Sequence, residues 1–302
     1  MDSYHKTQQA LDNLLIDRPK LSKGMDFFEL LDDGTKIQVY IQWKNQKLKF
    51  DFAGSSSVHP FNLNANPAIV HSVVTYVLRL LIQESIPLNE GLLKAVDINI
   101  PQNSFLNPQF WEDPRRNPAV VGGNTETSQR LTNLLLRAFG LIAGSQATMN
   151  NIIFGNQAFG YYETLGGGGG AGPTFTGASG VHHHMTNTRI TDPEILEYRY
   201  PVRLLNFTLR KNSGGKGLFS GGDGLIREYE FLEPVSLSIL SQQRNQGPYG
   251  LNGGEAGKVG EQYIIFQQGN KRKLKAIDHA ELAKGDRLLL LSPGGGAYGK
   301  KE

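Results

Sequence analysis

The stretch GGDGLIREYEFLEPVSLSIL, residues 221–240, carries the pattern that decides the fold. It contains two short runs rich in apolar side chains, 225–231 and 235–240, with glycines before the first run and a proline between the two. Short runs of this kind, bounded by glycine and proline, are typical of β-strands joined by tight turns. Residues 225–240 therefore predict two successive strands.

Similar runs recur throughout the second half of the chain. They stand at 151–154, 202–209, 263–266 and 287–291, and glycine-rich stretches separate them. A proline also begins one short helical segment, 193–197. We therefore expect residues 151–302 to form a glycine-rich, mainly antiparallel β portion without a long helix.

The first half opens with a helix and a small sheet. Residues 1–24 predict a helix, which Pro19 ends, followed by a polar connector. Residues 27–53 alternate between apolar and polar side chains, and turns are expected at 33–34 and 45–46. This pattern predicts a small antiparallel sheet.

Two buried helices are expected next. Asn66 and Pro67 suit the cap and first position of a helix spanning about 67–84, apolar on nearly all sides. The second helix spans about 126–143, with Thr125 or Thr127 as its cap and Gly144 closing it. The fold class is therefore α+β, in three parts that comprise 1–24, 25–150 and 151–302, the last two packed as one unit.

Composition narrows the class of protein. The 302 residues carry a net charge of +3 with the signs interspersed, so nothing indicates a nucleic-acid partner. Cysteine is absent, which excludes disulfides, thiolate catalysis and cysteine-ligated zinc. The most apolar run, 68–82, is too short to span a bilayer, and no signal peptide is visible. We expect a soluble, cytoplasmic protein without a membrane partner.

Glycine is over-represented, with 36 residues, compared with about 7% in average proteins. The glycines predict many tight turns and positive-φ positions, or loops that approach a ligand. The run at 166–170 is either an anion cradle or a flexible or tightly packed loop near a site; it matches no phosphate-binding motif. The polar stretch 122–129 is either a helix-capping arrangement or a corner that binds an oxyanion or amide.

Three consecutive histidines raise the question of chemistry. They lie in SGVHHHMTNTR, residues 179–189. In a strand, His182 and His184 would share one face and His183 would point away. Two imidazoles need a third ligand to hold zinc or manganese, and no second histidine-rich motif supplies it. A metal site held by this chain alone, a structural role, and a catalytic or substrate-binding role all stay open.

Several phrases together resemble the hydantoinase B/5-oxoprolinase family. From residue 119 onward they are AVVGGNTETSQR (119–130), SQATMNNIIFGN (145–156), GYYETLGGGGGAGP (160–173), SGVHHHMTNTRITDPEILEYRYPV (179–202), NSGGKGLFSGGDGLIREYEF (212–231), RNQGPYGLNGG (244–254) and SPGGGAYG (292–299). Upstream, DFAGSS (51–56), NLNANPAI (62–69), IPLNEGLLKAV (86–96) and SFLNP (104–108) occur in the same order. The sequence around residue 190 is most similar to that of the ATP-dependent 5-oxoprolinases.

The resemblance implies an activity that several parts share. An actin-like ATPase part, of hydantoinase A type, uses ATP and Mg to phosphorylate the oxygen of a small lactam, and the B part completes hydrolysis. For 5-oxoprolinase the reaction opens 5-oxo-L-proline to L-glutamate. The family's B part also begins with NDPY-, G-HxxD- and HH-D-GG-like motifs that resemble divalent-metal ligands, and this sequence shows no counterpart. The chain is therefore expected to be the C-terminal portion of a B-type polypeptide, oligomeric with its partners, inactive alone, and without metal ligands of its own.

The resemblance also directs attention to particular side chains. His182, His184 and Glu163 are the expected catalytic residues. The expected substrate-binding residues are Asn124, Glu126, Asn187 and Arg189. Two alternatives remain: a non-catalytic scaffold or assembly module of a related hydantoinase or carboxylase complex, and a free-standing lactam hydrolase that needs no ATP.

Overall fold

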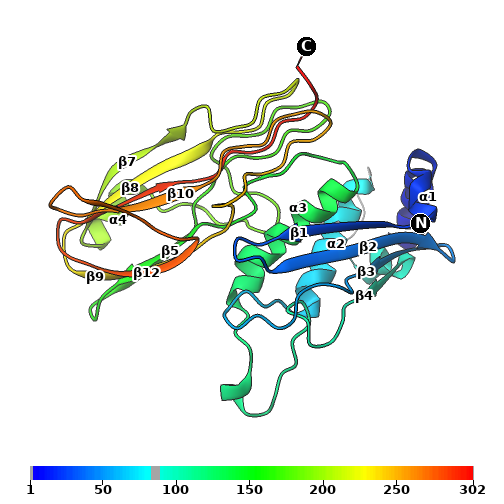
Figure 1. The fold of residues 1–302 in the computed structure, drawn as a ribbon, viewed down its shortest axis with the longest axis horizontal. Helices are drawn as coiled ribbons and strands as arrows, with labels where there is room; N and C mark the ends of the chain where they lie inside the picture. The colour runs from blue at the N-terminus through cyan, green and yellow to red at the C-terminus, as the bar shows by residue number, and fades with distance from the viewer. Residues whose placement is uncertain (1–2, 83–88, 302) are drawn as a thin grey trace. The chain divides into compact units, whose positions relative to one another are not determined.

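The α+β class is confirmed in a computed structural model of the chain, which describes residues 3–82 and 89–301 (Figure 1). The chain divides into two compact units, Met1–Ala138 and Phe139–Glu302. Each unit carries its own sheet structure.

The first unit contains the predicted small sheet. Strands β1 (Met25–Leu30), β2 (Lys36–Lys44) and β3 (Lys47–Asp51) form an antiparallel meander. Both predicted turns are present, and at the second one Asn45 and Gln46 have φ of 54° and 59°, the two positive values that a type I′ turn requires. Strand β4 (Val96–Asn99) extends the sheet and runs parallel to β3, which the sequence did not predict.

The first of the two predicted core helices begins where the sequence indicates. After α1 (Ser3–Asp17) and the 3₁₀ turn η1 (Pro19–Ser22), helix α2 (Pro67–Leu81) begins as expected, because the Asn66 side chain accepts the Ile69 N–H at 3.1 Å. It ends at Leu81; the predicted end at 84 lies outside the described residues. Helix α2 buries one face against the core and exposes His71 and Ser72 on the other. A 3₁₀ helix, η2 (Glu90–Ala95), precedes β4.

The prediction for the second helix was wrong at both ends. A π-helical turn, η4 (Gly123–Thr127), leads into α3 (Ser128–Ala138), and no side chain caps its start. Thr127 instead donates its hydroxyl to the Leu63 carbonyl at 2.6 Å. The helix ends before Gly140, whose φ of 55° cannot continue it. Gly144 does not close the helix; its N–H bonds the Tyr249 carbonyl at 2.8 Å.

Two antiparallel sheets form the second unit. One has the order β12-β9-β5-β6, and the other β11-β10-β13-β8-β7. Their strands are β5 (Asn151–Gly155), β6 (Gly160–Glu163), β7 (Val202–Arg210), β8 (Gly224–Phe231), β9 (Val235–Leu240), β10 (Glu261–Ile265), β11 (Lys271–Lys273), β12 (Ile277–Leu282) and β13 (Arg287–Leu291). All six predicted strands are confirmed; β6, β11 and β12 were missed. The short helix α4 (Pro193–Arg199) is confirmed as well.

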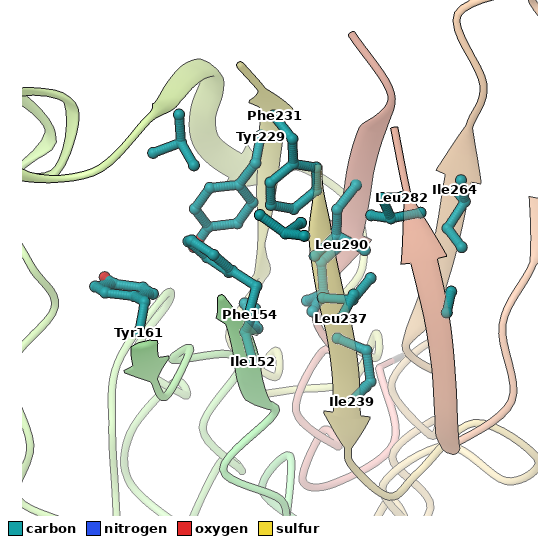
Figure 2. Close-up of a cluster of buried hydrophobic side chains, with 14 of the residues drawn as sticks. Ile152, Phe154, Tyr161, Tyr229, Phe231, Leu237, Ile239, Ile264, Leu282 and Leu290 are labelled. Atoms are coloured by element: carbon teal, nitrogen blue, oxygen red, sulfur yellow. The ribbon is translucent and has the colours of Figure 1, made fainter. Parts of the chain in front are cut away.

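The strands of the opening stretch, β8 and β9, belong to different sheets. The short connection at 232–234 therefore takes the chain from one sheet to the other. Between the sheets lies an apolar core in which Phe154 of β5 contacts the rings of Tyr229 and Phe231 of β8, with ring centroids 5.9 and 5.2 Å away (Figure 2). The two sheets thus form one sandwich around a common core.

Most glycines do not make turns, which corrects the prediction from composition. The segments 165–172, 177–181, 213–224, 247–258 and 292–299 run side by side toward the C-terminus (Figure 1). We call them the glycine bundle. Gly169 donates to the Ala178 carbonyl and accepts from the Gly222 N–H, and Gly222 in turn accepts from the Gly295 N–H. Each segment therefore bonds more than one neighbour at close range, and few of these glycines have positive φ.

The bundle also decides between the two interpretations of residues 166–170. The N–H groups of Gly167, Gly168 and Gly169 bond the carbonyls of Val181, Pro293 and Ala178, and Gly170 N–H bonds the Ser145 hydroxyl. Four consecutive donors are thus engaged within the protein. The run is a tightly packed segment, and these donors are not available as an anion cradle.

No helix among the described residues has the length and apolar character needed to cross a membrane.

Candidate functional site

The histidine stretch forms a loop between the glycine bundle and α4. The last residue of β6 and the residue after it hold this loop in place. Thr164 Oγ1 lies 2.9 Å from His182 Nε2 and 2.6 Å from Thr188 Oγ1. Glu163 accepts the Thr191 N–H at 2.8 Å. The loop 181–191 is therefore fixed against the end of β6 along most of its length.

His182 lies at the start of the loop, next to Val181. It is half-buried, and its loop neighbours Asn187, Thr188 and Arg189 are exposed. Burial lowers the pKa of His182 below its usual value, and the Thr164 carbonyl opposes this shift in part. The ring is therefore mainly neutral at pH 7, the form that can accept a proton.

His183 and His184 are held differently from the expectation for a strand. His184 lies in a turn with φ of 59°, so His182 and His184 do not alternate on a regular strand. The rings of His183 and His184 meet edge-on, with centroids 4.9 Å apart. His184 Nε2 lies 3.0 Å from Ser145 Oγ, the hydroxyl that also accepts the Gly170 N–H. His184 is thus attached to the glycine bundle.

Burial governs the charge of both rings. It lowers the pKa of His183 to about 4 and holds the pKa of His184 well below its usual value. The positive charge that a protonated neighbour would carry adds to each shift. Both imidazoles are therefore neutral at physiological pH.

Glu163 is the centre of a buried ion pair between the two sheets. Its Oε2 accepts the Tyr229 hydroxyl at 2.8 Å and lies 3.0 Å from Arg227 Nη2. Arg227 is completely buried, and the Phe207 ring covers its guanidinium at 4.6 Å. Burial, together with the negative charge of Glu163, raises the pKa of Tyr229 well above its usual value. Both carboxylate oxygens of Glu163 thus have partners within the chain.

The expected substrate-binding residues fall into two groups. Asn187 and Arg189 are exposed on the loop, and within the described residues their side chains make no hydrogen bond. Asn124 and Glu126 lie on η4 in the first unit, where Asn124 is exposed and Glu126 is completely buried. The structure therefore brings His182, Asn187 and Arg189 into one loop and places Asn124 and Glu126 in the other unit.

With this geometry in place, comparison with known proteins is informative. The sequence matches the Hydantoinase B/oxoprolinase family over residues 2–301. The chain belongs to this family. It is 49% identical to 5-oxoprolinase 1 of Arabidopsis thaliana over 90% of its own length and 21% of that protein. It is 24% identical to the B-type polypeptide of a putative D-/L-hydantoinase from a Pseudomonas species, over 87% of this chain and 46% of that polypeptide.

The fold of this family member is also found in a solved structure. It matches the ATP-dependent caprolactamase of Pseudomonas jessenii with a TM-score of 0.77, covering 97% of this chain and 55% of that one at 21% identity. The likeness shows a shared fold. The chain spans about a fifth of the length of the Arabidopsis 5-oxoprolinase.

Metal ligands do not cluster in the part of this family member that the structure describes. Within 3–82 and 89–301, no group of three histidine, cysteine, aspartate or glutamate side chains is arranged so that it could hold a metal ion. We therefore assign no metal ligand here and derive no step through a metal.

Sequence reasoning missed the partners of Glu163. Arg227 and Tyr229 alternate with outward-facing residues along β8, on the same side as the buried Leu225 and Phe231. A charged residue on the apolar face of a strand was the available signal, because a buried charge requires a partner of opposite sign. The sequence could not show that this partner is Glu163.

Proposed function

We propose that this chain is the C-terminal part of a hydantoinase B/5-oxoprolinase-type protein, and that it contributes to ATP-dependent hydrolysis of a cyclic amide such as 5-oxo-L-proline to L-glutamate. The observation that carries the proposal is the 49% identity to 5-oxoprolinase 1 over 90% of the chain. The fold shared with an ATP-dependent caprolactamase supports it.

The chemistry explains why ATP would be needed. The carbon of a lactam is a poor electrophile, because the ring nitrogen donates electron density to the carbonyl. Phosphorylation of the lactam oxygen turns that oxygen into a leaving group and makes the carbon more electrophilic, so that water can attack it. A base that removes a proton from the attacking water would assist its addition to the carbon. The ring C–N bond would then break as the nitrogen takes up a proton, and a second water would displace phosphate from the resulting acyl phosphate to leave the carboxylate.

His182 is the proposed proton acceptor. Its ring is neutral because burial lowers its pKa, and its Nε2 is oriented by Thr164, as a general base is commonly oriented by a third group. Asn187 and Arg189 would contact the substrate from the same exposed loop, and His184 is a second proton-transfer candidate.

Glu163 is proposed to hold the loop in position. Because its oxygens bind Thr191, Tyr229 and Arg227, it fixes the end of the loop that carries Asn187 and Arg189. Asn124 and Glu126 of the first unit are proposed to contribute further substrate contacts.

The proposed partners follow from the family. ATP and Mg would bind an actin-like ATPase polypeptide of hydantoinase A type, and a divalent metal would bind the preceding part of the B-type polypeptide. One relative is named as a component of a putative hydantoinase, which supports an assembly of several chains.

The test is a pull-down of the tagged chain from its native host, followed by turnover of 5-oxo-L-proline and ATP by the recovered assembly. Glutamate formation that falls at least tenfold in His182→Ala, with assembly intact, is the expected result. Recovery with partners but full turnover by His182→Ala and His184→Ala would remove the catalytic roles and favour a scaffold. Glutamate formation by the chain alone without ATP would favour the free-standing hydrolase.

A further inference from the structure

A chain of threonine hydroxyls leads from His182 to the surface of its loop. Thr164 Oγ1 lies 2.9 Å from His182 Nε2 and 2.6 Å from Thr188 Oγ1. Thr188 Oγ1 in turn lies 3.2 Å from Thr186 Oγ1. Hydroxyls from two separate segments thus continue the hydrogen bonding that begins at the ring. The proposed function uses only the first of them, to orient His182.

Exposure to solvent increases along this chain of hydroxyls. Thr164 is buried, with 3% of its surface accessible, and His182 is half-buried. Thr188 is exposed. Thr164 stands between the other two, because its hydroxyl contacts both of them. A single buried hydroxyl therefore connects the imidazole to a hydroxyl that bulk water can reach.

Every group in this chain can both take up and release a proton. A threonine hydroxyl carries one hydrogen and two lone pairs, and its hydrogen rotates to suit its partners. A neutral imidazole has one nitrogen that donates and one that accepts. Groups of this kind in a row can transfer a proton over the whole row, because each accepts one on one side and gives up another on the opposite side.

We propose that Thr164 and Thr188 form a proton relay between the His182 ring and solvent. The use of the relay in catalysis rests on the proposed function, in which the attacking water gives a proton to His182. That proton would bind Nδ1, because Nε2 is the nitrogen that contacts Thr164. Nε2 would release its own proton to Thr164 Oγ1. Thr164 would pass its hydroxyl proton to Thr188, and Thr188 would pass its proton to water.

The transfer balances at each group. Each hydroxyl gains one proton and loses one, and the imidazole is neutral before and after, with its proton moved from Nε2 to Nδ1. A half-buried imidazolium, which burial disfavours, is not formed. When the ring nitrogen of the substrate leaves, Nδ1 gives it this proton and the relay runs in reverse. Thr164 and Thr188 are positioning residues, since they act through His182.

The experiment measures how fast the Nε2–H proton of His182 exchanges with water, by NMR of the full chain labelled with ¹⁵N-histidine. His182→Gln identifies the signal by removing it. Thr188→Val keeps the branched shape and removes the hydroxyl, so exchange should slow about fivefold or more, because Thr164 loses the group that takes its proton. Thr188→Ser keeps a hydroxyl and should exchange at close to the wild-type rate. Thr208→Val, at an exposed position of β7, is the matched control and should leave exchange unchanged.

The direction of the change separates a relay from a contact that only holds the loop. Loss of a holding contact would loosen the loop and make exchange faster, whereas loss of a relay makes it slower. Thr164→Val repeats the test at the buried hydroxyl and should also slow exchange. Unchanged or faster exchange in Thr188→Val, failure of Thr188→Ser to restore it, or a ring protonated only on Nδ1 would each overturn the inference.

The exchange measurement needs no ATP, substrate or partner, so it is independent of turnover. Slow exchange in Thr188→Val with full turnover by His182→Ala in the recovered assembly would remove the proposed base and leave the relay. Exchange that does not depend on Thr188, with turnover lost in His182→Ala, would remove the relay and leave the proposed function.

Discussion

At the scale of single residues, the histidine triplet shows how position decides what a side chain can do. His182, His183 and His184 are chemically identical neighbours. His182 contacts Thr164, which follows β6, whereas His184 contacts Ser145, whose hydroxyl also accepts the Gly170 N–H of the glycine bundle. Burial keeps all three neutral at pH 7. His182 combines a neutral ring with exposed residues on the same loop, which is why it is the proposed proton acceptor.

The buried rings should make stability depend on pH. His183 has a folded-state pKa of about 4, below the ordinary value of about 6.5 expected when unfolded. Between these values the unfolded chain binds more protons, so the free energy of unfolding falls as pH drops below about 6.5. We expect His183 to contribute a loss of about 1–2 kcal/mol between pH 7 and pH 5.

Urea unfolding at the two pH values measures this effect. His183→Gln should reduce the difference between pH 7 and pH 5, whereas Gln157→Met, at an exposed position that carries no titratable group, should leave it unchanged. A wild-type stability that is equal at both pH values would contradict the burial of these rings.

Glu163→Gln should destabilise the sandwich strongly. The amide keeps one acceptor oxygen in place of two, so it can serve only one of the donors Thr191 and Tyr229. Arg227 would keep a buried positive charge without its counter-ion. Removing one partner of a buried pair costs about 3–5 kcal/mol, which urea unfolding can measure. Glu230→Gln breaks an exposed pair with Arg203 and should cost less than about 1 kcal/mol. Similar losses for the two variants would show that the Glu163 pair is solvated.

At the scale of elements, the glycine bundle is the feature that depends most on the absence of side chains. A Cβ on Gly295 would lie 1.9 Å from the Gly169 carbonyl oxygen, and backbone atoms have little freedom to move away. A Cβ on Gly160 would meet no atom within 4 Å. The two positions therefore form a natural pair for comparison.

Gly295→Ala should destabilise the chain by at least about 3 kcal/mol or prevent folding. The added methyl group would overlap backbone atoms, which cannot move aside as the side chains of an overpacked core can. Gly160→Ala should change the free energy of unfolding by less than about 1 kcal/mol. Soluble yield and thermal unfolding of the two variants test this. A Gly295→Ala protein with normal stability would show that the bundle is loosely packed.

At the scale of the whole molecule, the second unit contains everything its sandwich needs. All strands of both sheets and the apolar core between them fall within Phe139–Glu302. We therefore expect a fragment comprising 139–302 to fold by itself. It should show dispersed amide signals and one cooperative unfolding transition. A fragment with collapsed but undispersed signals would mean that the first unit is required for its packing.

The site was only partly predictable. The sequence indicated His182, Asn187 and Arg189 as neighbours because they lie in one short stretch, and the structure places them in one loop. It did not indicate that Thr164 would orient His182 or that Arg227 would engage Glu163. Those pairs join separate segments of the chain, and a local sequence pattern does not indicate which distant residue a strand will contact.

The sequence by itself determined the local elements of this protein. Residues 225–231 and 235–240 became strands because apolar runs between glycine and proline favour extended backbone, and Asn66 with Pro67 began a helix because their side chains suit its first turn. Only the tertiary structure decided that β8 and β9 join opposite sheets and that the glycines pack in a bundle. These outcomes depend on which distant backbones approach each other, because burial and hydrogen bonding between segments are properties of the whole fold.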